Sequence, residues 1–400
     1  MLIWGFMKKL FIVVRSISFG AAVGGMEKAA NQHISEMLSL GYEITLIAPE
    51  NKVSGQFPGK INFINVKWPR WDKYKILMTM GLAYTHWCKS VAKCLALETS
   101  ELDIVHLHGA SAGVLGFMEK EKLQKIVTVV NPHGMEEFGT GSVLRLINRK
   151  FTRSLLMNSK YADAVIATDS ILVPAVINNL KITKDKICII PNTIDIKKLR
   201  SLSLSAHSKN DNGRASIKFV SVGRIEYNKG YDLLAKAFTL LMNGSSLGID
   251  FEWIHYGRGK KKNSIVDYCM KNKIPAKFLS NSSDSEVQTA IASCDIFVQP
   301  SRYEGSSLTT LEAMTHGALI VAMPVGGIPD KIIDNKTGFL CKEVTVSALA
   351  ETLAKAINNI SDKQIRENAK IYVEENFDIS SSTKKYHDLY QKKAKEKVRI

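Results

Sequence analysis

The sequence predicts an α/β protein with two Rossmann-like domains, and three observations support this fold class. The chain has 400 residues, which is longer than a domain with one hydrophobic core usually is. Its residues are 45% apolar, which is enough to form packed interiors. Short apolar runs alternate with helical patterns in both halves, as in parallel sheets crossed over by helices. A Ser-, Asn- and Lys-rich stretch separates the halves. We therefore expect an N-terminal domain over 1–200, a linker over 201–216 and a C-terminal domain over 217–380.

Each domain contains its own series of predicted strands, which are short apolar runs bounded by turn or helix signals. In the first domain they are Lys9–Val14, Glu43–Ala48, Ile61–Val66, Asp103–Leu107, Ile126–Val130, Ala164–Ala167 and Ile187–Ile190. In the second domain they are Ile217–Val222, Phe251–His255, Lys277–Leu279, Ile296–Gln299 and Leu319–Ala322. A polar amphipathic pattern over Thr383–Lys397 predicts a C-terminal helix within 381–400, and such a helix can cross back onto the N-terminal domain.

The composition indicates a cytoplasmic protein. The six cysteines form no CxxC pair and no metal-ligand spacing, and most of them lie in apolar runs, which fits a reducing compartment. The apolar run after Lys8 and Lys9 ends at Arg15 without a cleavage pattern, so it reads as a first strand and not as a signal peptide. No segment approaches the roughly 20 apolar residues that span a bilayer.

The formal net charge of +16 has two interpretations. Nucleic acid, anionic lipid and phosphorylated substrates are all acidic partners that such a charge would attract. A lysine-rich solvated surface without a specific partner explains the charge equally well. The cations do not form one clustered tract and no nucleic-acid-binding motif is recognised, so we expect no nucleic-acid partner.

The most specific motif contains two carboxylates, Glu304 and Glu312, that bracket a strand-to-helix loop. Gly305 allows backbone to approach a ligand closely, and the N–H groups of Ser306, Ser307 and Leu308 at the helix start suit a phosphate. Glu304 and Glu312 would then accept hydrogen bonds from hydroxyl groups on either side of the phosphates. A sugar joined through diphosphate to a ribose has this layout. The alternative is that both carboxylates are ordinary solvated charges.

A second motif places two cations, Arg224 and Lys229, between Gly223 and Gly230 at the end of a predicted strand. The planar guanidinium matches phosphate oxygens and the ammonium adds a mobile point charge, so the pair can neutralise a leaving diphosphate without a metal. Ordinary surface cations in a loop are the alternative. No metal or other cofactor is expected.

The first half offers weaker candidates. Gly24 and Gly25 lie in a glycine loop after the first strand, without the GxGxxG pattern of a dinucleotide site. His133 follows a predicted strand, where a functional side chain would face a ligand, although a lone histidine beside Pro and Gly is more often a turn residue. His106 and His108 alternate along one strand and can face the same side, where a metal site would lack a third ligand, so we favour a structural role for them.

The segment Pro300–Gly317 (PSRYEGSSLTTLEAMTHG) closely resembles the signature of the family 4 retaining glycosyltransferases. The Arg224–Lys229 motif, the glycine loop and the His-Gly at His133 are also similar to segments of this family. The resemblance implies the GT-B fold, with two Rossmann-like domains facing each other across a deep cleft. It also implies a retaining hexosyltransferase that needs no metal.

The resemblance assigns a role to each motif residue. Arg224 and Lys229 would bind the donor phosphates, Glu304 and His133 the donor sugar, and Glu312 the ribose. Donor contacts would further come from the loop at Gly24 and Gly25, the glycine turn at Gly257 near the base, and the backbone of Ser306, Ser307 and Leu308. This sequence has Ser306-Ser307 where the family commonly has Phe-Gly, and Arg258 where an acidic residue is usual. These departures leave the identity of the donor open.

By resemblance, the expected reaction moves a sugar from a UDP-, GDP- or ADP-sugar to a glycan or lipid-linked acceptor, with a role in bacterial surface polysaccharide or lipopolysaccharide synthesis. A nucleotide-sugar epimerase of GT-B fold and a non-catalytic nucleotide-sugar-binding protein are the alternatives. The stretch Lys67–Lys75 mixes aromatic and cationic residues, which suits peripheral contact with an anionic membrane at its inner, cytoplasmic face. A helix packed in the core with lysines at its start explains the same stretch.

Overall fold

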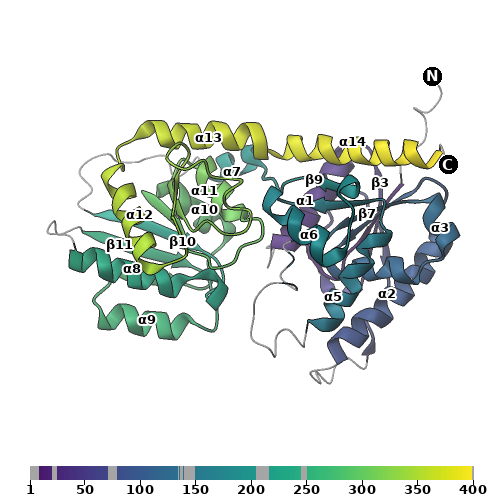
Figure 1. The fold of residues 1–400 in the computed structure, drawn as a ribbon, viewed down its shortest axis with the longest axis horizontal. Coiled ribbons are helices and arrows are strands. Elements are labelled where there is room, and N and C mark those ends of the chain that lie inside the picture. Colours follow the sequence, from purple (N-terminus) through teal and green to yellow (C-terminus); the bar gives the residue numbers. More distant parts are fainter. Residues whose placement is uncertain are drawn as a thin grey trace. The chain divides into compact units, whose positions relative to one another are not determined.

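The computed structural model describes residues 9–19, 25–70, 79–133, 135, 138, 149–203, 216–244 and 250–398. The chain divides into two compact units (Figure 1). The first unit is formed by Met1–Asn192 together with Ser382–Ile400, and the second by Thr193–Ser381.

The first unit is built on a seven-stranded parallel sheet in the order β5-β3-β1-β6-β7-β8-β9. Its strands are β1 (Lys9–Val13), β3 (Glu43–Ala48), β5 (Asn62–Asn65), β6 (Ile104–His108), β7 (Val127–Asn131), β8 (Ala164–Ala167) and β9 (Ile187–Ile189). Two short strands, β2 (Ile17–Ser18) and β4 (Val53–Ser54), pair separately. Each of the seven strands predicted in this half corresponds to one strand of the sheet, and β2 and β4 were not predicted.

Apolar side chains cover both faces of this sheet, because successive residues of a strand point to opposite sides. In β1, Phe11 and Val13 join one buried cluster with Trp87, and Leu10 and Ile12 join the other with Tyr390. Continuous apolar runs are therefore required in the central strands. The helices of this unit are α1 (Gly25–Ser39), α2 (Thr79–Glu98), α3 (Lys120–Lys125), α5 (Lys150–Leu156), α6 (Val173–Leu180) and most of α14 (Ile379–Val398).

The second unit repeats the architecture with a six-stranded parallel sheet in the order β12-β11-β10-β13-β14-β15. Its strands are β10 (Ile217–Val222), β11 (Phe251–Tyr256), β12 (Ala276–Leu279), β13 (Ile296–Gln299), β14 (Leu319–Ala322) and β15 (Phe339–Leu340). Its helices are α7 (Ile196–Ser203), α8 (Tyr231–Gly244), α9 (Lys262–Lys271), α10 (Asp284–Ser293), α11 (Leu308–Thr315), α12 (Val346–Asn358) and α13 (Lys363–Phe377). The strand order reverses direction between β10 and β13, where ligands bind in sheets of this type.

The chain enters the second unit at Thr193, ahead of the predicted boundary at residue 200. Ile194 donates its backbone N–H to Phe377 O at 3.0 Å, and Ile196 packs in a buried cluster with Val373. These contacts hold the start of α7 to α13. Of the predicted linker 201–216, residues 201–203 end α7 and residues 204–215 lie outside the described ranges.

The last helix, α14, returns to the first unit and is held there by buried polar contacts as well as apolar ones (Figure 1, yellow). The fully buried Tyr390 places its hydroxyl 2.5 Å from His106 Nδ1 and 2.8 Å from His33 Nε2. Ser382 donates to Glu36 Oε1 at 2.9 Å. Within the ranges that the structure describes, no helix has both the length and the apolar character of a membrane span.

We predict that Tyr390→Phe lowers the free energy of unfolding by about 1–3 kcal/mol, because two buried histidine nitrogens lose the hydroxyl that they share. Urea denaturation followed by circular dichroism measures the change. Tyr161→Phe is the matched control, because the Tyr161 side chain is exposed in the same unit. Equal stability of Tyr390→Phe and wild type would contradict this account of how α14 is held.

Candidate active site

The candidate site in the second unit lies in the loop that leads from β13 into α11. β13 is fully buried and ends at Gln299, and Glu304 and Glu312 are themselves 9% and 5% exposed. These carboxylates are therefore not the solvated charges of the alternative interpretation. Burial of an ionised group is costly unless neighbouring groups hydrogen-bond to it, so the partners of each carboxylate define the site.

Lys229 forms an ion pair with Glu304. Its Nζ lies 2.9 Å from Glu304 Oε1 and 2.7 Å from Oε2, and the two side chains are 19% and 10% exposed. Gln299 Nε2 and Ser301 Oγ each donate to Oε2 at 3.0 Å. The carboxylate thus receives donors from both sequence motifs, and the structure places those motifs side by side.

Backbone and side-chain contacts fix the turn that carries Lys229 against the Glu304 loop. Asn228 O accepts the backbone N–H of Arg302 at 2.8 Å, and the Arg302 guanidinium binds both carboxylate oxygens of Asp232 at 2.7 and 2.6 Å. Gly230 has a φ of +68°, and a side chain there would place its Cβ 1.8 Å from Pro300 O. Only glycine therefore allows this close approach.

Arg224 follows β10 by two residues and has a different partner. Its side chain is 58% exposed and its Nη1 lies 3.4 Å from Glu226 Oε1, so it is not part of the buried Glu304 cluster. The neighbouring glycines are sterically required. Gly257 has a φ of +152°, and a Cβ on it would lie 1.9 Å from Gly223 O. Gly257 thus lets β10 and β11 end close together.

The start of α11 presents backbone N–H groups beside Glu304. Ser307 precedes Leu308, the first residue of the helix, and Ser307 Oγ accepts from Thr310 Oγ1 at 3.0 Å. The first N–H groups of a helix have no intrahelical acceptor and attract anions. In the described structure the Ser306 hydroxyl is buried without a hydrogen-bond partner, so it remains available to a ligand.

Glu312 is held by a residue that the sequence did not indicate. Gln288, on α10, donates to Glu312 Oε2 at 2.9 Å, and His316 lies 2.9 Å from Gln288 Oε1. Gln299, Ser301 and Arg302 were also not singled out. For Gln299 the sequence did contain a signal, because it is a polar residue at the end of the otherwise apolar run IFVQ of β13.

In the first unit, His133 follows β7 and belongs to a chain of buried histidines. Its Nε2 lies 3.0 Å from His108 Nδ1, and the His108 ring stacks on His106 with centroids 4.6 Å apart. The φ of His133 is +61°, and Asn131 Oδ1 supports this turn by accepting the His133 N–H at 3.0 Å. Among the described residues, no group of three metal-ligating side chains has metal-site geometry.

Gly24 lies outside the described ranges, and Gly25 is the first residue of α1.

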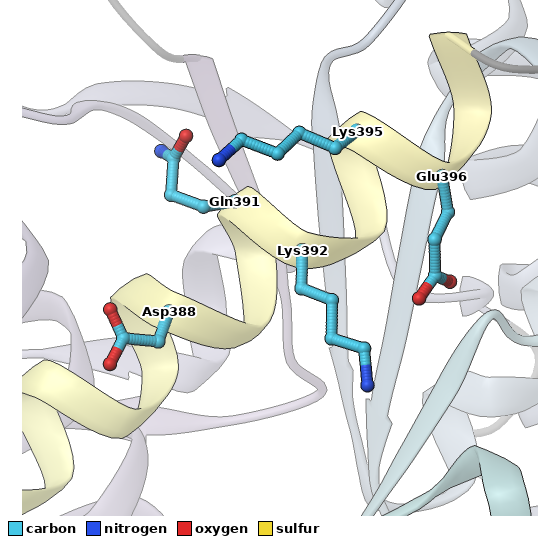
Figure 2. Close-up of a pocket in the computed structure, with 5 residues that line it drawn as sticks. All are labelled: Asp388, Gln391, Lys392, Lys395 and Glu396. Atoms are coloured by element: carbon cyan, nitrogen blue, oxygen red, sulfur yellow. The ribbon is translucent and has the colours of Figure 1, made fainter.

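Two further regions bear on the predictions. Trp68 of the aromatic and cationic stretch packs against Tyr84 and Trp87, and residues 71–75 of that stretch lie outside the described ranges. A cavity of about 420 Å³ opens along one face of α14, and Figure 2 shows Lys395 extending toward Gln391 there. Its lining is Asp388, Gln391, Lys392, Lys395 and Glu396, which includes none of the predicted site residues.

The histidine chain predicts how stability depends on pH. Burial lowers the pKa of His133 to about 4, and burial and the nearby His133 lower that of His33 to about 3. Below about pH 6.5 these histidines therefore bind protons in the unfolded chain but stay neutral in the folded chain. The free energy of unfolding should fall between about pH 6.5 and pH 4, by about 1.4 kcal/mol per pH unit for each proton withheld.

Urea denaturation at pH values across this window tests the prediction. His33→Gln should flatten the slope by about one proton, whereas His86→Gln, which changes an exposed histidine of the same unit, should leave the slope as in wild type. A slope that His33→Gln does not change would show that His33 does not contribute to it.

Two family models match the chain. The model for glycosyl transferases group 1 matches residues 205–372, and the model for glycosyltransferase family 4 matches residues 23–198. Together they extend over most of both units. The chain belongs to the family 4 glycosyltransferases.

Individual relatives agree with this assignment. An uncharacterized glycosyltransferase of Methanocaldococcus jannaschii is 26% identical, over 96% of this chain and 99% of the relative. A glycogen synthase of Thermodesulfovibrio yellowstonii is 30% identical, over 42% of this chain and 34% of that protein. The phosphatidylinositol N-acetylglucosaminyltransferase GPI3 subunit of Saccharomyces cerevisiae is 25% identical, over 67% of this chain and 58% of that protein.

Solved structures show that this family 4 glycosyltransferase has the GT-B fold. WaaG, a glycosyltransferase involved in lipopolysaccharide biosynthesis, has a TM-score of 0.72 and 17% identity, covering 95% of this chain and 99% of WaaG. HepE of Anabaena in complex with UDP-glucose has a TM-score of 0.69 and 17% identity, covering 96% and 99%. A glycosyltransferase of Rickettsia africae has a TM-score of 0.69 and 18% identity, covering 96% and 98%.

Proposed function

We propose that this glycosyltransferase is a retaining, metal-independent hexosyltransferase that moves a sugar from a nucleoside diphosphate donor onto a glycan or lipid-linked acceptor. The observation that carries the proposal is the buried Lys229–Glu304 pair beside the start of α11. A cation, a buried carboxylate and the N–H groups of a helix start lie together at the point where the strand order reverses, and such groups can bind phosphate and hydroxyl groups.

Each group in the second unit would then have one task. The diphosphate would bind the N–H groups at the start of α11, and Lys229 and the exposed Arg224 would neutralise its charge as it departs. Two positive charges would make this neutralisation possible without a metal. Glu304 would accept hydrogen bonds from sugar hydroxyls, and Glu312 from the ribose. The family resemblance assigns His133 of the first unit to the donor sugar, and we keep that role as part of the proposal.

The transfer would break the bond between the anomeric carbon and the diphosphate oxygen and form a bond from that carbon to the acceptor hydroxyl oxygen. We propose that departure and attack use the same face of the sugar, which retains the anomeric configuration. The hydroxyl proton would pass to an oxygen of the leaving diphosphate. No protein nucleophile is then needed, and the cations would stabilise the charge that develops.

Nucleotide release from a panel of UDP-, GDP- and ADP-sugars, with and without EDTA, tests the reaction class. We expect one donor to turn over slowly without acceptor and EDTA to leave the rate unchanged. Lys229→Ala and Glu304→Gln should lower turnover about a hundredfold, since each removes a group aligned for the transition state. Lys277→Ala is the matched control, because Lys277 is an exposed lysine of the same unit that is paired with a glutamate.

The results separate the proposal from its alternatives. Wild-type rates in both site variants would contradict the assigned roles, and loss of activity in EDTA would contradict metal independence. Conversion of the donor sugar into its epimer would favour an epimerase. Binding of a donor without turnover, even when lipid extract is supplied as a source of acceptor, would favour a non-catalytic nucleotide-sugar-binding protein.

We further propose that the acceptor belongs to bacterial surface polysaccharide or lipopolysaccharide synthesis and that the protein acts at the inner face of the cytoplasmic membrane. The net charge of +16 supports contact with anionic lipid. Support for the pathway comes from two similar proteins, since WaaG is involved in lipopolysaccharide biosynthesis and the GPI3 subunit is a phosphatidylinositol N-acetylglucosaminyltransferase.

Flotation with vesicles tests the membrane proposal. We expect the protein to float with phosphatidylglycerol-containing vesicles at low salt and to dissociate as salt is raised, because charge would supply the attraction. Vesicles of phosphatidylcholine alone are the control. Binding that is absent, or equal on both kinds of vesicle, would contradict an electrostatic contact.

A further inference from the structure

A buried glutamine on α10 contacts the second carboxylate of the motif. Gln288 and Glu312 are each 5% exposed, and they come from different helices of the second unit. Gln288 Nε2 lies 2.9 Å from Glu312 Oε2, and Gln288 Oε1 lies 2.9 Å from His316 Nε2. One amide thus joins Glu312 to His316, which lies four residues further along the chain at the C-cap of α11.

The chemistry of the three groups fixes the direction of these bonds. A carboxylate only accepts, so the amide NH₂ of Gln288 must face Glu312. The amide oxygen then faces His316, whose Nε2 must carry a proton and donate. The carboxylate therefore determines which end of the amide is turned toward Glu312, because a flipped Gln288 would place its amide oxygen against a carboxylate oxygen.

The surroundings of Gln288 suggest that its polarity serves a purpose. Ile291 and Ala292, which follow at helical spacing, are buried apolar residues, so an apolar side chain at 288 would continue the core face of α10. The start of this helix is set by a capping box between Ser283 and Glu286. A buried amide is stable here only because both of its ends are bonded.

We infer that Gln288 is a positioning residue for the donor ribose, acting through Glu312. This inference rests on the proposed function, in which Glu312 accepts hydrogen bonds from the ribose hydroxyls. A carboxylate that accepts a hydrogen bond from a fixed donor keeps its rotamer, and its oxygens keep one orientation. Two hydroxyls on adjacent ribose carbons require such an orientation, whereas a sugar ring lacking them does not.

Two substitutions remove the hydrogen-bond donor at position 288 in different ways. Gln288→Met keeps the length of the side chain without its polarity, and Gln288→Glu keeps the shape while replacing the donor by a second carboxylate. Gln364→Met is the matched control, since Gln364 is an exposed glutamine of the same unit. Thermal unfolding of each variant checks that it is folded, and Gln288→Met keeps the test available if the two carboxylates of Gln288→Glu unfold the protein.

Calorimetric titration measures affinity for whichever of UDP, GDP and ADP the wild-type protein binds and for its 2′,3′-dideoxy counterpart. We expect both Gln288 variants to bind the ribose nucleotide about tenfold more weakly than wild type, which is the size of one lost hydrogen bond to a charged group. Binding of the dideoxy nucleotide should change little, because it has no hydroxyl for Glu312 to accept. A general structural defect would weaken both nucleotides alike.

Combining Gln288→Met with Glu312→Gln should weaken binding no further than Glu312→Gln alone, because the two residues act on one contact. If wild type discriminates between the nucleotides and the Gln288 variants discriminate equally well, the inference about Gln288 is overturned while the donor site stands. If wild type binds none of the three diphosphates, the proposed function and this inference both fail.

Discussion

The parallel pairing of β10 with β13 is the constraint on which the chemistry of the second unit depends. Phe219 and Val220 of β10 pair with Ile296 and Phe297 of β13, although the two strands are separated in sequence by β11 and β12. The loops that follow these strands therefore emerge at the same edge of the sheet. Lys229 follows one strand and Glu304 the other, so the pairing makes their contact possible.

This contact offsets part of the cost of burying charge at the same edge. Glu304 receives donors from Lys229, Gln299 and Ser301, and Glu312 receives one from Gln288. Each carboxylate is thereby held in one rotamer by groups on neighbouring elements. Removing one partner would leave a buried carboxylate with fewer hydrogen bonds. The resulting loss of folding free energy is larger than the net contribution of the removed hydrogen bond. The two carboxylates are consequently held in place more firmly than carboxylates in a solvated loop would be.

The repeated layout of the sheets was predictable from sequence because strands buried on both faces consist of continuous apolar runs. Strands of two residues leave no such signal, and β2, β4 and β15 were missed for that reason. The motif residues were found because glycine and charge stand out at strand ends. Gln288 was not found, because its significance depends on how α10 packs against α11, and no local pattern in the sequence records that contact.

The histidines of the first unit illustrate the same limit more strongly. From sequence, His106 and His108 share a face of β6 and His133 is a separate residue after β7. In the structure, His133 bonds to His108, His108 stacks on His106, and His106 bonds to Tyr390 from the far end of the chain. Since burial keeps the His106 and His108 imidazoles neutral, each has one N–H donor and one acceptor nitrogen, and in the described structure the Nε2 atoms of both lie buried without a hydrogen-bond partner. The last helix is therefore linked to His133 through one hydrogen bond, one ring stack and a second hydrogen bond, and no local pattern in the sequence records these contacts.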